Sequence, residues 1–427
     1  MKKTLQHLLL MAASLSFALL LGEGALRIAG VAYNGSFFQP DTERGWALRP
    51  NTEGWEIGET KNYVRINSDG LHDREHFLAK PPGTLRIAVL GDSCTESMQQ
   101  PIEKGFPSIV EQQLSGCSSV GNRKVEVINF GVSGYGTAQE LITLREKVWK
   151  YSPDIVLLAF YAGNDVFNNH RDFNPSSGAA DQCPYFVLQN GRLVLDESFR
   201  RARDLQPSSM RWQAVRSQFV NHSRVAQLFY HILNTRRQRA AGGQRLDAKT
   251  ETQIPDPGNQ MYLPPGNPKL EDAWRVTEAL LATINREVRA HGAEFWIVSL
   301  WMSQQVSPDP AARQQLCNRL GLSNLSYPDL RIRELATKEN IPLLLLAPAA
   351  AAYTQGHKVF VNGGVLMPPG VGHFNELGHR LAGELIASNL CSRSGLITGA
   401  ARAGNQETAI ACPVSGVSLH HAVLTGR

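Results

Sequence analysis

Five short apolar runs alternate along the chain with segments whose apolar residues recur at helical spacing. Each run has the length of a buried strand, and they lie at residues 85–90, 125–128, 155–160, 293–300 and 343–346. Helical patterns separate or follow them near residues 107–114, 137–149, 271–290, 330–338 and 374–390. Strands that alternate with helices form a parallel sheet with helices on both faces. We therefore predict a three-layer α/β fold for residues 85–393.

The segments on either side of this core have patterns of their own. Residues 31–84 contain a run of alternating polarity, Tyr63 to Leu71, which is typical of a strand followed by a loop. We predict a small β extension there. The tail, residues 394–427, is small, polar and without periodicity. We predict that this tail is disordered or loosely attached.

An insert at residues 166–268 interrupts the alternation of strands and helices. Two apolar runs on either side of Asn190-Gly191 predict a β-hairpin. Apolar spacing predicts one helix over residues 217–239, and its basic end is typical of a solvated terminus, with contact to anionic lipid or polysaccharide as the alternative. The glycines and prolines of residues 240–268 predict a flexible link. We interpret the whole insert as a lid or substrate-shaping element.

Polar residues and glycines follow the first three predicted strands. Ser93 ends the motif Gly91-Asp92-Ser93, Gly134 lies in the segment after the second strand, and Asn164 follows the third. The carboxyl ends of parallel strands meet at one edge of a sheet, where α/β proteins place their ligands. A hydroxyl, an accessible backbone N–H and a neutral amide suit acyl transfer through an oxyanion. For each motif alone, a turn or a helix cap is the alternative.

Together with His373-Phe374-Asn375 before the last helix, these motifs resemble the SGNH hydrolases, also called GDSL-type esterases. That family carries Ser, Gly, Asn and His in four short blocks in this order. The resemblance covers roughly residues 85–165 and 290–390 and implies a flavodoxin-like hydrolase fold. It implies that Ser93 is the nucleophile and His373 the general base. It also implies an oxyanion hole made by the N–H groups of Ser93 and Gly134 and the amide of Asn164, with Asp92 and Asp165 in support.

The chain departs from the family at the third member of the triad. The family usually carries an Asp two or three residues before the His, where this chain has Val371 and Gly370. No Asp or Glu occurs from residue 340 to residue 372. A backbone carbonyl or a carboxylate from elsewhere, with Asp165 and Asp309 as candidates, could hold the imidazole; otherwise His373 acts in a dyad. Loss of the acid slows a triad enzyme by several orders of magnitude, so we expect a slow esterase or a degenerate site.

His379 is the competing histidine of this region. It falls nearly opposite the helical stripe formed by Phe374, Leu377, Leu381 and Leu385. We therefore predict that His379 is solvated. A metal pair with His373 is not expected, since nothing nearby completes a ligand set. We expect neither a metal nor a cofactor.

Composition and charge change this picture little, but the N-terminus adds to it. A net charge of +5 over 427 residues is small and diffuse, and does not indicate nucleic acid as a partner. Lys2 and Lys3 precede an apolar stretch from Leu8 to Leu21, as in a signal sequence. We predict an uncleaved signal anchor over residues 1–30, with a cleaved signal peptide and a buried helix as alternatives. The lysines are expected on the cytoplasmic side, with the rest exported.

The cysteines agree with export but do not specify it. Six cysteines fit an oxidising compartment. Cys94 follows the nucleophile and is expected to be buried as a small apolar residue. The pairing of the other five, Cys117, Cys183, Cys317, Cys391 and Cys412, cannot be read from the sequence.

The sequence thus predicts an exported, membrane-anchored serine hydrolase of the cell envelope. It would cleave O-acyl esters, acetyl esters first, on a small molecule or on an envelope or extracellular polysaccharide. Two alternatives remain open. One is an O-acyltransferase that uses the same nucleophile. The other is a catalytically inactive envelope binding protein, which the missing acid suggests.

Overall fold

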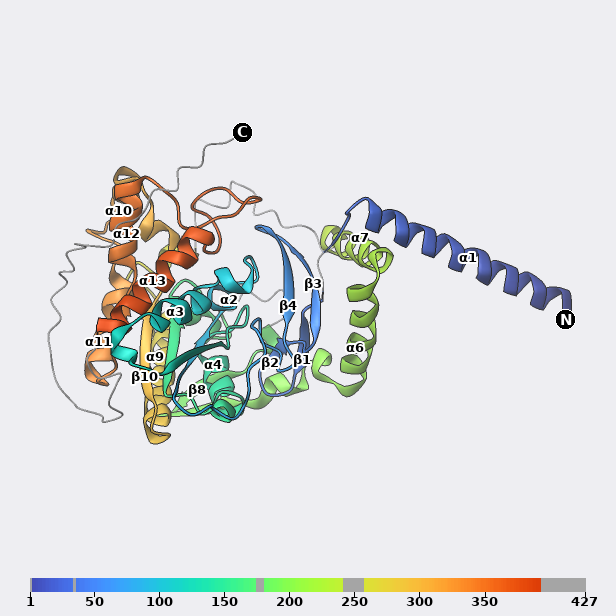
Figure 1. Ribbon diagram of the computed structural model, residues 1–427. Coiled ribbons are helices and arrows are strands. Elements are labelled where there is room, and N and C mark those ends of the chain that lie inside the picture. The colour runs from blue at the N-terminus through green and yellow to red at the C-terminus, as the bar shows by residue number, and fades with distance from the viewer. Residues whose placement is uncertain (1, 34–35, 174–179, 241–256, 393–427) are drawn as a thin grey trace.

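A five-stranded parallel sheet forms the centre of the protein (Figure 1). The computed structural model describes residues 2–33, 36–173, 180–240 and 257–392. The strands lie in the order β11-β10-β7-β5-β6, and every neighbouring pair is parallel. The predicted parallel sheet is confirmed, with strands at β5 (Thr84–Gly91), β6 (Lys124–Asn129), β7 (Ile155–Phe160), β10 (Glu294–Ser299) and β11 (Leu343–Leu345).

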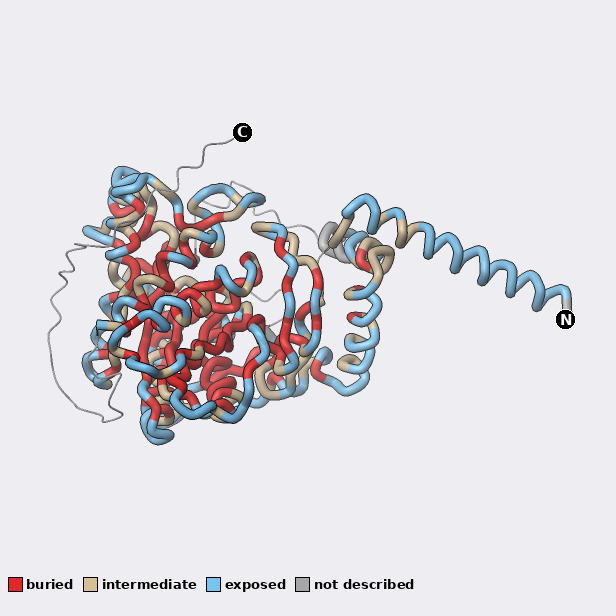
Figure 2. The backbone as a smooth tube through the Cα atoms, viewed as in Figure 1, coloured by how far each residue is buried: buried red, intermediate tan, exposed pale blue. Residues whose placement is uncertain are grey.

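Helices cover both faces of this sheet, because its central strands are apolar on both sides. Along β5, Ile87 and Val89 join one buried apolar cluster, whereas Ala88 and Leu90 join the other. Figure 2 shows the buried interior that results. The first cluster includes residues of α3 (Phe106–Ser115), α12 (Ala347–His357) and α13 (Glu376–Ser392). The second includes residues of α4 (Thr137–Glu146), α9 (Pro268–Ala290), α10 (Pro310–Leu320) and α11 (Tyr327–Lys338).

Short helical segments complete the core. The α-helical ones are α2 (Ser93–Glu96), α5 (Asp165–Asn168) and α8 (Pro257–Gln260). Single 3-10 turns lie at Ile102–Lys104, Ser118–Val120, Val148–Tyr151, Ala180–Gln182, Glu197–Arg201, Arg203–Leu205 and Ser303–Val306. The helix that the pattern extends to residue 149 therefore ends at Glu146 and continues as a 3-10 turn.

Two antiparallel hairpins lie in the segment for which a β extension is predicted. They are β1 (Phe38–Asp41) with β2 (Gly45–Leu48), and β3 (Thr52–Ile57) with β4 (Lys61–Ile66). The second hairpin is fixed to the core near its turn. The Nδ2 of Asn62 donates to the carbonyls of Met98 and Gln100 at 2.9 and 2.7 Å. The Thr60 hydroxyl donates to the Gln99 carbonyl at 2.7 Å.

The insert contains the predicted hairpin but not the predicted single helix. β8 (Tyr185–Gln189) pairs with β9 (Arg192–Asp196), and Asn190 and Gly191 both have positive φ, as a two-residue hairpin turn requires. The single helix over 217–239 is wrong. Two helices, α6 (Pro207–His222) and α7 (Arg224–Ala240), meet at Ser223, which is extended. Residues 241–256 of the predicted link lie outside the described residues.

The break at Ser223 has a local and a distant cause. The Ser223 hydroxyl accepts the N–H of Ala226 at 3.2 Å, as an N-cap residue does. The Glu23 carboxylate accepts hydrogen bonds from the N–H groups of Arg224 and Val225 at 3.0 and 3.1 Å. These are N–H groups of the first turn of α7, which have no partner within their own helix. A local pattern of apolar residues cannot report a cap supplied from residue 23. α6 contacts β1 and β3, and α7 contacts α1; the interpretation of the insert as a lid remains a prediction.

The N-terminal segment is one long helix, α1 (Lys2–Ile28), that projects from the rest of the chain (Figure 1). By length and composition, residues 3–28 could cross a membrane, and their most apolar stretch has no buried residue. The alternative of a buried N-terminal helix is therefore wrong. The predicted tail lies outside the described residues.

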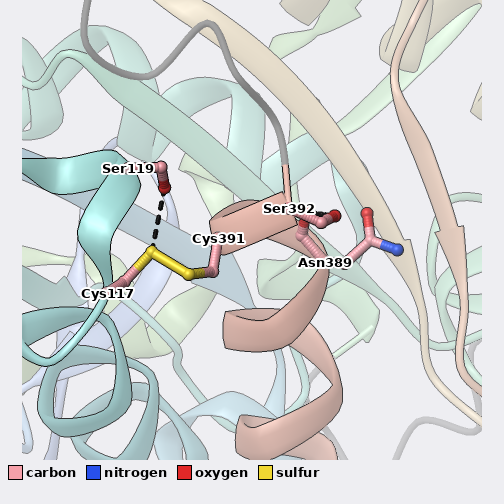
Figure 3. The surroundings of a disulfide bond; sticks show 5 residues. All are labelled: Cys117, Ser119, Asn389, Cys391 and Ser392. Carbon is pink, nitrogen blue, oxygen red and sulfur yellow. Dashed lines mark hydrogen bonds between the residues drawn. A yellow bond between two sulfur atoms is a disulfide. The ribbon is translucent and has the colours of Figure 1, made fainter. Parts of the chain in front are cut away.

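One disulfide joins the ends of two helices on the same face of the sheet (Figure 3). Cys117 follows α3 and Cys391 lies in the last turn of α13, with their Cα atoms 5.8 Å apart. The bond holds α13, which follows the catalytic histidine candidate, against α3. Cys94, Cys183 and Cys317 are buried, so the expectation for Cys94 is confirmed.

His379 is buried, which contradicts the prediction that it is solvated. Its side of α13 faces α3, and the exposed fraction of His379 is 0%. The ring stacks on Phe106, and Nδ1 accepts a hydrogen bond from the Phe106 N–H at 3.4 Å. The helical stripe was misleading because α13 is buried on more than the face that its leucines mark. Burial, with the charges of His373 and His72, lowers the pKa of His379 to about 3.

This buried imidazole predicts a loss of stability in acid. The pKa of His379 is lower in the folded chain than the ordinary 6.5. The contribution of His379 to the free energy of unfolding is therefore complete above pH 6.5 and falls as the pH drops toward 3. Each pH unit below 6.5 lowers the free energy of unfolding by about 1.4 kcal/mol. Between pH 7 and pH 5, the free energy of unfolding of His379→Asn should fall by about 2 kcal/mol less than that of the unaltered chain. The measurement is urea unfolding in detergent. An unchanged pH dependence would contradict this.

Candidate active site

The Ser93 hydroxyl and the His373 imidazole meet at the carboxyl edge of the sheet. β5 ends at Gly91, and Ser93 begins α2 directly after it. His373 lies in the loop before α13, 280 residues later. Its Nε2 is 2.8 Å from the Ser93 Oγ, a distance at which a base can accept the hydroxyl proton. Both side chains are partly exposed, so a substrate can reach them.

A carboxylate that sequence reasoning missed lies on the other side of the imidazole. The Oε1 of Glu59 is 2.8 Å from His373 Nδ1, and its Oε2 accepts the backbone N–H of His373 at 2.9 Å. Glu59 is in the turn between β3 and β4. Two hydrogen bonds to one residue fix both the position and the ring orientation of His373. Ser93, His373 and Glu59 therefore form a continuous hydrogen-bonded row.

The two other candidates for this carboxylate are engaged elsewhere. Asp165 is fully buried and accepts the backbone N–H of Tyr161 at 2.7 Å. Asp309 accepts the N–H of Ala311 at 2.9 Å and caps α10. Neither interpretation of these residues as the acid is supported. The expected alternative of a Ser–His dyad without an acid does not match the structure either, because Glu59 contacts His373 Nδ1.

The loop before His373 is shaped around Glu59. A Cβ on Gly372 would lie 2.6 Å from Glu59 Oε1, and Gly372 has a φ of +86° that disfavours other residues. The Leu366 N–H donates to the Glu59 carbonyl at 2.9 Å. The carboxylate thus occupies space that a side chain at residue 372 would fill. The loop before His373 therefore lacks an acid of its own and instead leaves room for the Glu59 carboxylate from the β3–β4 turn.

The electrostatics of this row favour a charged imidazole. Burial lowers the pKa of His373, but the hydrogen bond to Glu59 and the nearby carboxylates outweigh burial and raise it above its ordinary 6.5. Burial raises the pKa of Glu59, but the hydrogen bonds and the charge of His373 outweigh burial. The net pKa of Glu59 is below its ordinary value, so the carboxyl is ionised at neutral pH. A proton taken from Ser93 would therefore be stabilised on His373.

This raised pKa predicts the pH dependence of any reaction in which His373 is the base. The base must be neutral to accept a proton, so activity should rise with pH and reach half its plateau above pH 6.5. The measurement is kcat/KM for an acetyl ester between about pH 5 and pH 9. A flat profile over this range, or a half-point below 6, would contradict the assignment.

The predicted oxyanion donors lie on the loops after the neighbouring strands. Gly134 follows β6, is exposed and has a φ of +79°. A Cβ there would approach the Trp46 ring to 3.3 Å, so glycine suits this position. Asn164 follows β7, and one N–H of its amide donates to Asp92 Oδ2 at 2.8 Å. The amide is therefore oriented by Asp92, and the role of Asn164 as an oxyanion donor stays a prediction.

Buried carboxyl groups hold these loops together beneath the site. Asp92 is fully buried and also accepts the Cys94 N–H at 2.8 Å, which fixes the turn around Ser93. Glu96, at the end of α2, accepts a hydrogen bond from the Ser133 hydroxyl, next to Gly134. Burial raises the pKa of Glu96 to about 8, so this carboxyl is protonated at neutral pH. Asp92 as a supporting residue of the site stays a prediction.

Comparisons with known proteins place this site in context. No family model matches the chain. A curated relative, the arylesterase of Vibrio mimicus, is 34% identical over 90 residues, which are 21% of this chain and 41% of that protein. The chain therefore spans about two fifths of the length of the curated relative that it matches. The chain resembles the SGNH hydrolases.

Similar solved structures are also esterases or related proteins by their descriptions. One is the acetylxylan esterase Axe2 from Geobacillus stearothermophilus, at 12% identity and a TM-score of 0.35, with 72% of this chain and 95% of that chain covered. Another is TesA, at 11% identity and a TM-score of 0.34, with 71% and 97% covered. Similarity at this level does not carry over an activity or a substrate.

Proposed function

We propose that this chain is a serine esterase of the SGNH type that hydrolyses O-acyl esters. The observation that carries this proposal is the row Ser93–His373–Glu59, with both hydrogen bonds at 2.8 Å. A hydroxyl, a base and an orienting acid in this order activate a nucleophile on unrelated folds. The order of the four motifs and the similarity to an arylesterase support the same reaction class.

In the first half-reaction, the Ser93 Oγ attacks the acyl carbonyl carbon and His373 Nε2 takes the hydroxyl proton. The carbonyl oxygen becomes an oxyanion, which the N–H groups of Ser93 and Gly134 and the Asn164 amide stabilise. The intermediate collapses, the bond between the carbonyl carbon and the alcohol oxygen breaks, and the alcohol leaves with the proton from His373. In the second half-reaction, water attacks the acyl-serine carbonyl and His373 Nε2 takes its proton. The bond between the carbonyl carbon and Ser93 Oγ then breaks, Oγ regains a proton from His373, and the carboxylic acid is released.

Glu59 acts through His373 and does not touch the substrate. It keeps the Nδ1 proton in place, so that Nε2 faces Ser93 with its lone pair. Its negative charge stabilises the imidazolium that forms in each half-reaction. With this acid present, we propose an active triad rather than the slow or degenerate site that the local sequence suggests.

The location of the enzyme is part of the proposal. α1 is proposed as an uncleaved membrane anchor, with the catalytic domain on the exported side of the cell envelope. The Cys117–Cys391 disulfide supports an oxidising compartment, since disulfides persist outside the cytosol. An exported site favours acylated polysaccharides or small molecules of the envelope, with acetyl as the proposed acyl group.

The test is hydrolysis of p-nitrophenyl esters from acetate to butyrate by the full chain and by Ser93→Ala. We expect turnover that is fastest for acetate and lost in Ser93→Ala. Addition of a sugar acceptor separates transfer from hydrolysis, because an O-acyltransferase would form acylated sugar faster than free acid. Equal rates with and without Ser93 would overturn the proposed mechanism, and the absence of turnover would favour an inactive binding protein.

A further inference from the structure

The outward side of α6 carries large apolar side chains in contact with solvent. Trp212, Val215 and Phe219 follow one another at helical spacing and therefore share one side of the helix. Their exposed fractions are 68%, 50% and 66%. Ser217 and Val220, on another side, are buried where α6 contacts β1 and β3. Side chains of this size and exposure in one row mark a surface that binds something apolar.

The position of α6 relative to α1 is fixed by specific contacts. The Glu23 carboxylate caps α7 through the N–H groups of Arg224 and Val225. The Arg27 guanidinium donates to the His222 carbonyl, at the end of α6, at 2.9 Å. The corner between α6 and α7 is thus bound to the last turns of α1, directly after its apolar stretch.

Because Ser217 and Val220 are buried toward the core, the apolar row lies on a side of α6 that is turned away from β1 and β3. In Figure 1, α6 runs crosswise to α1 along the edge of the molecule that faces α1. A membrane crossed by α1 would therefore extend along α6. The corner at residues 222–225 lies where the apolar stretch of α1 ends, which is the level of the membrane surface.

The positive charge of α6 and α7 favours an anionic partner. Residues 207–240 contain six arginines and no Asp or Glu. Arg211 and Arg236 are exposed. An exposed apolar row with a Trp, on a segment with basic residues and without acids, suits contact with the surface of an anionic bilayer.

We propose that α6 is an interfacial helix whose face, formed by Trp212, Val215 and Phe219, is inserted into the headgroup region of the anionic membrane that α1 crosses. This inference rests on the proposed membrane anchor. Because α6 also packs against β3, which leads to the turn that carries Glu59, the catalytic domain is held at one orientation to the membrane instead of swinging on a tether.

The test places an environment-sensitive fluorophore on single cysteines in the full chain, reconstituted into vesicles of phosphatidylethanolamine and phosphatidylglycerol. The background is Cys412→Ser, because Cys94, Cys183 and Cys317 are buried. Phe219→Cys is the test position. Leu15→Cys, within α1, reports the anchor, and Phe77→Cys, which is 79% exposed on the segment before β5, is the aqueous control.

We expect the label at residue 219 to be quenched by lipids with a nitroxide near the headgroup, and to be protected from iodide by about threefold or more relative to residue 77. Quenching at 219 by iodide as strong as at 77 would overturn the proposal. Protection from iodide without quenching by lipid would indicate a second copy or another protein on this face, and would also overturn it.

The label at residue 15 and ester hydrolysis separate failure of this inference from failure of the proposed membrane anchor or the proposed reaction. If the label at residue 15 is not quenched by lipids with a nitroxide on the acyl chain, the anchor and the inference fall together. If 15 is quenched and 219 is not, the inference alone fails. Ester hydrolysis by the same samples reports the proposed reaction independently of either label.

Discussion

Replacement of Glu59 by Gln is expected to lower kcat for ester hydrolysis by about 10³ to 10⁴. Glutamine keeps the shape of the side chain but removes the charge that stabilises the imidazolium. Its NH₂ group can also donate to Nδ1, which favours the tautomer with the proton on Nε2, facing Ser93. The half-point of the pH profile should also move down, because the hydrogen bond and charge of Glu59 raise the pKa of His373.

The matched control is Glu53→Gln on the same hairpin. Glu53 lies in β3, is exposed and pairs with Arg65 at 3.6 Å. This change should leave kcat and the pH profile unaltered. A Glu59→Gln enzyme that folds normally and keeps its rate within about threefold would show that the imidazole needs no acid from the β3–β4 turn.

His373→Ala is expected to lower kcat by about 10⁶, because loss of the base removes proton transfer in both half-reactions. The KM should change far less, since His373 does not anchor the substrate in its ground state. The measurement is steady-state hydrolysis of p-nitrophenyl acetate by the purified full chain. His357→Ala is the control, since His357 is exposed on α12 and stacks on Tyr353. A loss of less than about tenfold in His373→Ala would mean that another group accepts the Ser93 proton.

The elements that the sequence predicts well are those with a strong local cause. The runs at 85–90 and 155–160 correspond to β5 and β7, because strands buried on both faces must be continuously apolar. The Asn190-Gly191 turn is predictable for a similar reason, since few residues accept its backbone conformation. Ser93 and His373 could be proposed as a pair because their motifs, Gly91-Asp92-Ser93 and His373-Phe374-Asn375, resemble those of the SGNH hydrolases.

The elements that the sequence does not predict depend on partners far along the chain. Glu59 is 314 residues from His373, and nothing around it differs from an ordinary hairpin turn. The usable signal lies at the other end, where Gly370 and Gly372 precede a histidine without a local acid. The break between α6 and α7 is similar only in part, because Glu23 adds to a cap that Ser223 supplies locally. His379 was misassigned because α3 buries a side of α13 that carries no leucine stripe.

The most direct test of the central claim is covalent labelling of the full chain with a serine-reactive fluorophosphonate, followed by mass spectrometry of its peptides. The account predicts one labelled residue, Ser93, with no labelling in Ser93→Ala and much slower labelling in both His373→Ala and Glu59→Gln. Labelling that is absent from the wild type, or that proceeds at the same rate in all of these variants, would contradict it.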